Sequence, residues 1–253
     1  MGQRISDESR EKQGRGKGEG VNWIPWIQKR DFSGSTKFNQ IPSFKFPGRN
    51  IETFSSIEEN LIYMVDVADN VIDFYEQYPL LPLTETIKIS KEQEIEHIPF
   101  AANKKAVVTT DLVVRLKNKK LVAICVKSWM DLKDPRVIAK IQIEQLYWKK
   151  RKVKWILVTE REFEEIQTEN LRQLRQYIFI NDKFQKAVYD ELKQAVKDSD
   201  ERIGEVLKKC SKHLKLTYAN TIEIFFQLIA TKQVRVDLSK MVSIERYVSE
   251  LTF

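Results

Sequence analysis

Apolar and polar positions alternate along the middle of the chain with the periods of strands and helices in turn. The predicted elements are a helix over 55–68, a strand over 71–82 that ends at Pro79, a strand over 106–118, a strand over 120–129, a helix over 134–152 and a strand over 153–161. The polar region 84–95 stays ambiguous. Strands that alternate with helices indicate an α/β domain, which we expect to end near residue 166.

Individual side chains refine these predictions. Ser56 is the expected N-cap of the first helix, and Pro135 fits the first turn of the second. The run over 120–129 is almost continuously apolar, as in a strand that is covered on both faces, and 153–161 is expected to be buried in the same way.

The two ends of the chain have different sequence patterns from the middle. Residues 1–22 are rich in Gly and charge, and we expect a flexible basic segment. After residue 166 the pattern is mostly helical, and residues 234–243 could form a short β-wing. We therefore predict three parts: the flexible segment 1–22, an α/β domain over 23–166, and a helical, winged-helix-like domain over 167–253.

A carboxylate and an amine stand at related places in the two central strands. Asp111 lies in the apolar segment TTDLVV, and Lys127 ends VAICVK. If the strands pair around a turn at 118–120, both side chains come near one end of the sheet. A buried unpaired charge is costly, so the two groups should meet a metal ion and water, or each other in a salt bridge. The pattern alone leaves both possibilities open.

Composition narrows the class of protein. The 253 residues are 42% hydrophobic, which suits a globular protein, and no apolar run is long enough to cross a membrane. The first 20 residues lack an apolar segment after their charges, so a signal peptide is not expected. Two distant cysteines favour a reducing compartment, and two His without a CxxC motif make a structural zinc site improbable.

The net charge of +7 is unevenly distributed. Residues 51–100 hold 2 basic and 11 acidic side chains, and residues 101–150 hold 12 basic and 4 acidic ones. Basic surface suits a polyanion such as DNA, although a solvated surface explains it nearly as well. An acidic block beside a basic block is also what a metal-dependent nuclease needs, since carboxylates bind cations and cations bind phosphates.

Several motifs together resemble the TnsA family, the endonuclease subunits of heteromeric cut-and-paste bacterial transposases. The motifs are a Gly-rich stretch before IPW (15–27), an acidic helix before EQYPLLP (55–82), the TTDLVV strand (109–114), CVK (125–127), and IEQLYW before a WxxxT strand (141–162). The resemblance covers about residues 15–165. Beyond that, only the helical pattern agrees.

The resemblance implies a restriction-endonuclease-like core with a mixed sheet. It also implies a Mg²⁺-dependent hydrolase, with Mn²⁺ as a substitute, that cleaves double-stranded DNA at the 5′ ends of a transposon. The expected partners are a DDE-type transposase subunit, which acts on the 3′ ends, and an AAA+ regulator ATPase, which would contact the C-terminal domain. We expect a cytoplasmic bacterial protein without a membrane partner.

The resemblance also suggests roles for individual residues. Glu58 and Asp111 match the acids that bind magnesium, Lys127 matches the lysine that orients and activates water, and Glu144 matches a further acid near the site. Cys125 stands where the family has Gln. A thiol is a poor ligand for a hard cation, so the backbone carbonyl of Cys125 is the better candidate for a metal ligand.

The surrounding residues allow structural explanations as well. The basic run of Lys149, Lys150, Arg151, Lys152 and Lys154 is a candidate for contacts with the DNA backbone or the charged end of a helix. Trp23 and Trp26 are expected to be packing anchors rather than DNA-stacking residues, and Tyr147 and Trp148 to be core.

Two other functions compete with the nuclease of a transposon. One is a non-catalytic adaptor that links the transposase to its ATPase, with an idle site at Cys125. The other is a stand-alone restriction or repair nuclease, against which the IPW and EQYPLLP segments argue.

Overall fold

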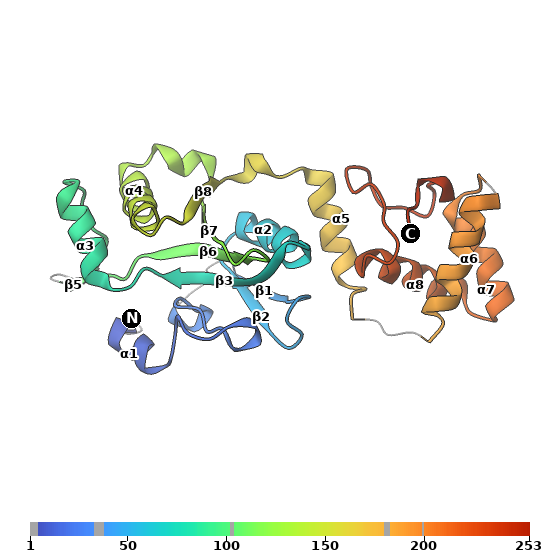
Figure 1. The fold of residues 1–253 in the computed structure, drawn as a ribbon, viewed down its shortest axis with the longest axis horizontal. Helices are drawn as coiled ribbons and strands as arrows, with labels where there is room; N and C mark the ends of the chain where they lie inside the picture. Colours follow the sequence, from blue (N-terminus) through green and yellow to red (C-terminus); the bar gives the residue numbers. More distant parts are fainter. Residues whose placement is uncertain (1–4, 33–37, 102–103, 180–182, 199) are drawn as a thin grey trace. The chain divides into compact units, whose positions relative to one another are not determined.

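The computed structural model describes residues 5–32, 38–101, 104–179, 183–198 and 200–253 (Figure 1). The chain divides into two compact units, Met1–Phe163 and Glu164–Phe253. The helices are α1 Asp7–Lys12, α2 Ser56–Val67, α3 Leu83–Glu92, α4 Pro135–Lys150, α5 Glu165–Arg175, α6 Gln185–Asp198, α7 Ile203–Leu214 and α8 Tyr218–Ala230. The strands are β1 Asn39–Pro42, β2 Asn50–Thr53, β3 Val71–Pro79, β4 Pro99–Ala101, β5 Lys104–Lys105, β6 Thr109–Leu116, β7 Leu121–Val126 and β8 Lys154–Val158.

A four-stranded mixed sheet in the order β3-β6-β7-β8 forms the centre of the first unit. The pairs β3–β6 and β6–β7 are antiparallel, and β7–β8 is parallel. The predicted mixed α/β core is thereby confirmed. β7 lies inside the sheet and is buried over residues 123–126, as its apolar run predicted. β8 differs from the prediction, because it is the last strand in the order and only Val158 of it is fully buried.

Helices α3 and α4 contribute to one hydrophobic core together with strands of the sheet. Ile89 of α3, and Ile143, Tyr147 and Trp148 of α4, pack in the same cluster as Val113 and other buried strand residues. The Trp148 Nε1–H donates to Thr110 Oγ1 at 2.7 Å, and the Tyr147 hydroxyl donates to the Leu81 carbonyl at 2.7 Å. The prediction that Tyr147 and Trp148 are core residues is confirmed.

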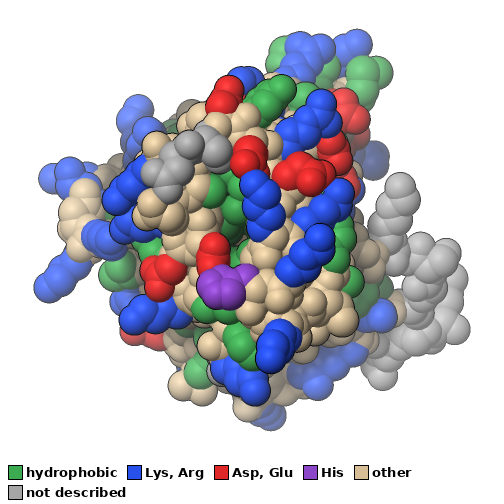
Figure 2. All heavy atoms as spheres, turned by 90° about the vertical axis from the view of Figure 1, so that its right-hand side faces the viewer, with side chains coloured by type: hydrophobic (Ala, Val, Ile, Leu, Met, Phe, Trp, Pro, Cys, Tyr) green, Lys and Arg blue, Asp and Glu red, His purple; other side chains and the backbone are tan. Residues whose placement is uncertain are grey.

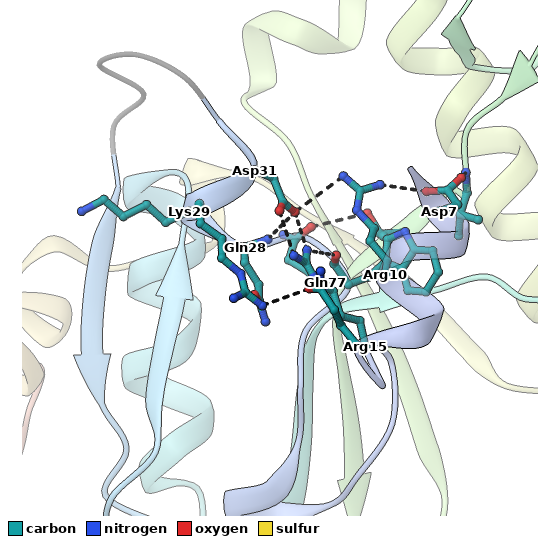
Figure 3. Close-up of polar contacts among 12 residues, drawn as sticks. Asp7, Arg10, Arg15, Gln28, Lys29, Asp31 and Gln77 are labelled. Atoms are coloured by element: carbon teal, nitrogen blue, oxygen red, sulfur yellow. Dashed lines mark hydrogen bonds and ion pairs between the residues drawn. The ribbon is translucent and has the colours of Figure 1, made fainter. Parts of the chain in front are cut away.

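The N-terminal segment, for which the composition predicts flexibility, makes defined contacts over the part that the structure describes. Helix α1 forms there, and Arg15 is buried. The Arg15 guanidinium donates to both carboxylate oxygens of Asp31, at 2.5 and 2.9 Å, and to the Trp26 carbonyl at 2.9 Å (Figure 3). A bidentate pair of this kind fixes both partners, which explains how a Gly-rich and charged segment becomes ordered.

The two motifs around IPW and EQYPLLP meet in the structure. Trp23 and Trp26 are both buried, as expected for packing anchors. The Trp26 N–H donates to the Gln77 carbonyl at 3.2 Å, and the Trp23 Nε1–H donates to the Glu76 carbonyl at 3.1 Å. Gln77 has a φ of 49°, an unusual value for a residue other than Gly inside a strand.

Helices α5 to α8 surround the core of the second unit, so the prediction of a mostly helical C-terminal part is confirmed. Residues 234–243, the expected β-wing, contain no strand in the structure. Asn170 of α5 instead binds this segment through the carbonyls of Leu238 and Lys240, at 2.9 and 2.8 Å. The segment's backbone bridge, between Arg235 and Thr252, runs to the chain end rather than across a hairpin.

Charged side chains of both signs cover the surface. In Figure 2, Lys and Arg side chains are spread over the visible face, with Asp and Glu side chains between them. On α7, for example, Lys208 pairs with Glu205 and Lys209 with Glu201. Among the residues that the structure describes, no helix has the length and apolar character needed to cross a membrane.

Candidate active site at the ends of β6 and β7

Asp111 and Lys127 form an ion pair at one end of the central strands. Asp111 is buried in β6, and its Oδ2 accepts from the Lys127 Nζ at 2.9 Å and from the Val126 N–H at 2.7 Å. Lys127 Nζ also donates to the Val126 carbonyl at 2.5 Å. The hairpin therefore brings the acid and the amine together, as their positions in the sequence predicted.

Their electrostatics favour the charged forms of both groups. Burial by itself would raise the pKa of Asp111, but Lys127, Lys140 and the Val126 N–H outweigh it and hold this pKa below its usual value. Burial would lower the pKa of Lys127, but Asp111 raises it above the ordinary lysine range. Lys127 is therefore a cation at every pH of practical interest.

The register of β6 and β7 accounts for the position of Cys125. Leu112 pairs with Ile124, and Val113 with Ala123, so one further step along the ladder sets Cys125 opposite Asp111. Opposed Cβ atoms in such a ladder lie about 5 Å apart. Burial raises the pKa of the Cys125 thiol, and the Glu144 and Asp111 carboxylates raise it further, so the sulfur is a protonated thiol in the chain without a metal ion.

Helix α2 brings Glu58 to the same place. The N-cap is Ser55 rather than the predicted Ser56, and its Oγ accepts from the Glu58 N–H at 3.1 Å. The Glu58 Oε2 accepts from the Phe54 N–H at 3.1 Å, so the side chain folds back over the start of its own helix. Glu58 and Asp111 line one small pocket, with Leu61, Leu112 and Val126 among its other walls. Burial and the charge of Asp111 raise the pKa of Glu58 to about 7.

Helix α4 contributes the third carboxylate, Glu144, which is completely buried. Its Oε1 accepts from the Trp155 Nε1–H at 3.1 Å, and its Oε2 has no hydrogen-bond partner within the described chain. Burial and the charge of Asp111 raise the pKa of Glu144 to about 7. A buried carboxylate oxygen without a partner is costly, so a ligand that supplies a proton or a positive charge would be stabilised there.

These residues are compatible with a divalent cation, although the side chains alone do not form a complete site. In the described part of the chain, no group of three or more His, Cys, Asp or Glu side chains is arranged to hold a metal ion. Glu58 and Asp111 share a pocket, and the charge of Asp111 makes Glu58 harder to ionise, which a cation between them would relieve. Main-chain carbonyls would have to complete such a ligand set, as magnesium and calcium sites commonly require.

The basic run at the end of α4 lies apart from this site. β7 and β8 are parallel, with Lys154 beside Val122 and Val158 beside Val126. Lys154 is therefore four strand residues, or about 13 Å, from the end of the sheet that carries Lys127. Lys150 pairs with Glu92 at 3.0 Å, and Arg151 with Glu85 at 2.6 Å, so two members of the run have acidic partners on α3. Lys149 and Lys152 are exposed.

The structure adds site residues that the sequence reasoning did not identify. The charge of Lys140 on α4 helps to lower the pKa of Asp111 and opposes the rise in the pKa of Glu144. The main-chain groups of Val126 contact Asp111 and Lys127 directly. Lys140 had a signal in the sequence, because it stands four residues before Glu144 on one helix face. The role of Val126 had none, since it depends on the main chain alone.

Comparisons with known proteins show which family the sequence resembles. Residues 68–160 match a family model described as the TnsA-like endonuclease N-terminal domain. The chain is also 32% identical over 165 residues to the transposon Tn7 transposition protein TnsA of Escherichia coli. The aligned segment is 64% of this chain and 59% of that protein, so the match spans less than two thirds of the relative. The chain is therefore similar to TnsA, and its residues 68–160 match a TnsA-like endonuclease domain, as its motifs had suggested.

Proposed function

We propose that the chain is a Mg²⁺-dependent endonuclease that cuts duplex DNA at the 5′ ends of a transposon. The observation that carries this proposal is the Asp111–Lys127 pair at the end of two core strands, with Glu58 lining the same pocket as Asp111. A purely structural ion pair would not need a second carboxylate at that point, since Asp111 makes Glu58 more difficult to ionise.

Glu58 and Asp111, with a main-chain carbonyl, would hold Mg²⁺, and Mn²⁺ would substitute for it. The sequence suggests the Cys125 carbonyl for that role, and the contact between the Val126 carbonyl and Lys127 makes Val126 a second candidate. When bound, the cation would polarise the scissile phosphate and neutralise part of its charge. Glu144 is completely buried, so it would affect the charge of the site without binding the cation directly.

Lys127 would act as a fixed cation and a hydrogen-bond donor. Its raised pKa argues against a role as a general base, since a base must give up its proton near the working pH. A protonated amine close to Asp111 Oδ2 can orient the attacking water and stabilise the negative charge that develops on the phosphate oxygens. This refines the role of activating water that the family resemblance suggested for Lys127.

The partners belong to the same proposal. We propose that a DDE-type transposase subunit processes the 3′ ends and that an AAA+ regulator ATPase binds the helical unit Glu164–Phe253. Cleavage by the free chain would damage the host genome, so activity should depend on assembly. The isolated chain is expected to nick DNA weakly or not at all.

Calorimetry with Mn²⁺ on the isolated chain tests the metal site without partner or cognate DNA. Wild type should bind Mn²⁺ at millimolar or lower concentration, and Asp111→Asn should abolish that binding. Asp237→Asn, which alters an acid of the second unit, is the matched control and should bind like wild type. Equal binding by wild type and Asp111→Asn, with and without DNA, would favour the adaptor function, which the thiol at position 125 makes the main competitor.

Cleavage by the reconstituted complex is the second test. Removal of the metal by a chelator should stop 5′-end cleavage, and addition of excess Mg²⁺ or Mn²⁺ should restore it. Asp111→Asn and Lys127→Met should each lower the rate of 5′ cleavage at least about 100-fold, the usual effect of losing one electrostatic contact in a transition state.

A further inference from the structure

An exposed apolar tip follows directly after Lys127. The chain leaves β7, passes Ser128 and enters the 3-10 helix η3 at Trp129–Lys133. Trp129 is 41% exposed and Met130 is 65% exposed, the highest value among the large hydrophobic residues that the structure describes. Single exposed apolar residues are ordinary, but two in succession beside a candidate active site require an explanation.

The tip is held in place rather than loosely attached. Ser128 caps η3, with its Oγ accepting from the Met130 N–H at 3.3 Å. The Trp129 N–H donates to Glu160 Oε2 at 2.9 Å, and the Arg161 guanidinium stacks over the Trp129 ring at 3.6 Å from its centroid. Such a stack fixes the indole ring and leaves Met130 as the most prominent apolar group.

The neighbouring turn that supplies these contacts starts at the same edge of the sheet. Glu160 and Arg161 belong to the 3-10 helix η4 at Glu160–Glu162, which follows β8. The Lys127 N–H donates to the Val158 carbonyl at 3.1 Å, so the ends of the parallel strands β7 and β8 are tied together. The apolar tip and its cation therefore stand beside the site at which the scissile phosphate is proposed to bind.

The small size of the tip favours DNA over a protein partner. The residues that follow Met130 in the chain, from Asp131 to Arg136, are mostly charged and exposed, with Lys133 and Arg136 balanced by Asp131 and Asp134. A stable protein interface needs on the order of 1,000 Å² of buried surface, which an apolar patch of two residues does not approach. One apolar side chain is sufficient to enter a base step, where Met, Leu, Ile or Phe acts as a wedge.

We propose that Met130 inserts between two base pairs next to the scissile phosphate, with Trp129 and Arg161 as its support. This inference rests on the proposed nuclease function and assigns its substrate a distorted geometry. Unstacking one step bends the duplex and turns a phosphate of the backbone toward Lys127 and Asp111. The cation of Arg161 faces the same backbone and offsets part of the cost of unstacking.

The test is fluorescence of 2-aminopurine placed in a duplex that spans the transposon end and its flanking DNA. The label is moved one position at a time, and Ca²⁺ replaces Mg²⁺ so that DNA is bound without being cut. With the full chain, one or two neighbouring label positions should brighten several-fold as they unstack. Met130→Ala should lose this increase in fluorescence. Its affinity for the duplex should fall by no more than about tenfold and keep the same salt dependence, because the protein's contacts with the phosphates remain.

Two further variants control for general effects. Met130→Leu keeps an apolar wedge and should retain the fluorescence increase. Met241→Ala removes an exposed Met of the second unit, 50% exposed in the structure, and should behave like wild type. In the reconstituted reaction, Met130→Ala should slow 5′ cleavage about tenfold or more, and Met130→Leu should restore most of the rate.

Each outcome decides one question. Equal fluorescence for wild type and Met130→Ala, or no increase at any label position, would overturn the wedge. Loss of co-elution with the transposase in Met130→Ala, with unchanged DNA fluorescence, would overturn it in favour of a protein contact. A wild-type complex that brightens the label but never cuts would instead overturn the proposed nuclease function and leave the wedge standing.

Discussion

At the scale of single residues, the site combines the carboxylates of Glu58, Asp111 and Glu144 with the ammonium groups of Lys127 and Lys140. Asp111 is held ionised by Lys127, and its negative charge then makes Glu58 and Glu144 harder to ionise. This division follows from position, because Lys127 Nζ lies 2.9 Å from Asp111 and is not hydrogen-bonded to either of the other two acids. A bound cation would therefore stabilise the ionised forms of Glu58 and Glu144 the most.

Glu144→Gln should make the protein more stable at high pH. The pKa of Glu144 in the folded chain, about 7, lies above its ordinary value of 4.5, so folding favours the protonated form. Its contribution to the free energy of unfolding is therefore lost as the pH rises from about 4.5 through 7. Gln stays neutral and avoids this loss, so at pH 8 the variant should be more stable than wild type by roughly 1–3 kcal/mol, since one pKa unit corresponds to about 1.4 kcal/mol.

Chemical denaturation at a series of pH values between 4 and 9 measures this difference. Glu205→Gln is the control, since Glu205 is an exposed acid of α7 that pairs with Lys208 and has its pKa lowered. That variant should show no stabilisation at pH 8. The same pH profile for wild type and Glu144→Gln would mean that Glu144 is ionised without cost in the folded chain.

At the scale of elements, the start of α2 determines where Glu58 stands. Ser55 caps the helix and also donates to Glu58 Oε1 at 3.2 Å, so one side chain fixes both the helix end and the acid. The cap and the site are therefore coupled through a single turn of helix.

Ser55→Ala should lower both stability and metal affinity. Loss of an N-cap costs about 1 kcal/mol in the free energy of unfolding. Glu58 also loses a hydrogen bond that positions it, so Mn²⁺ binding should weaken several-fold in calorimetry. Thr217→Ala removes the corresponding cap of α8 in the second unit and should cost a similar free energy without any change in Mn²⁺ affinity. Equal Mn²⁺ affinity in both variants would show that the helix cap does not contribute to metal binding.

The sequence was sufficient for the elements with strong periodicity. The order of α2, β3, β6, β7, α4 and β8 agrees with the predictions because each carries a clear apolar pattern and a recognisable turn or cap. Helix α3 stayed ambiguous, since only Thr86, Ile89 and Ser90 of it are buried and a mostly polar helix has little periodic signal. The expected wing failed for a tertiary reason, because Asn170 binds the backbone that a hairpin would have paired.

For the candidate site, the sequence was informative about residue types and less so about partners. The Asp111–Lys127 contact followed from hairpin register, but whether its residues bind metal stays a prediction. Glu144 came from family resemblance, and its burial against Trp155 could not be foreseen from spacing. The separation of the basic run from the site depends on the parallel direction of β8, which only the assembled sheet reveals.

At the scale of the whole molecule, the chain consists of two units with separate cores. The candidate metal site, from Glu58 to Glu144, lies entirely within Met1–Phe163, and the helices α5 to α8 lie within Glu164–Phe253. Each unit is within the size range of independent domains.

A fragment that ends at Phe163 should fold and bind Mn²⁺ like the full chain, because every proposed ligand and its supporting contacts lie inside it. Circular dichroism and calorimetry on this fragment test the expectation, with Asp111→Asn in the fragment as the control. The proposed ATPase contact should be lost from the fragment and retained by a fragment that starts at Glu164. A fragment without metal binding, despite a folded spectrum, would mean that the second unit helps to form the site.

The ammonium of Lys127 has a consequence for how metal affinity is measured. It already neutralises Asp111 Oδ2, so an incoming cation competes with a counter-ion that is covalently part of the chain. If the cation has to displace Lys127 from Oδ2, only the fraction of free protein with Lys127 turned away can bind it, and the apparent dissociation constant is raised accordingly. A DNA phosphate that attracts Lys127 would release Asp111, so substrate and cation would each raise the apparent affinity for the other.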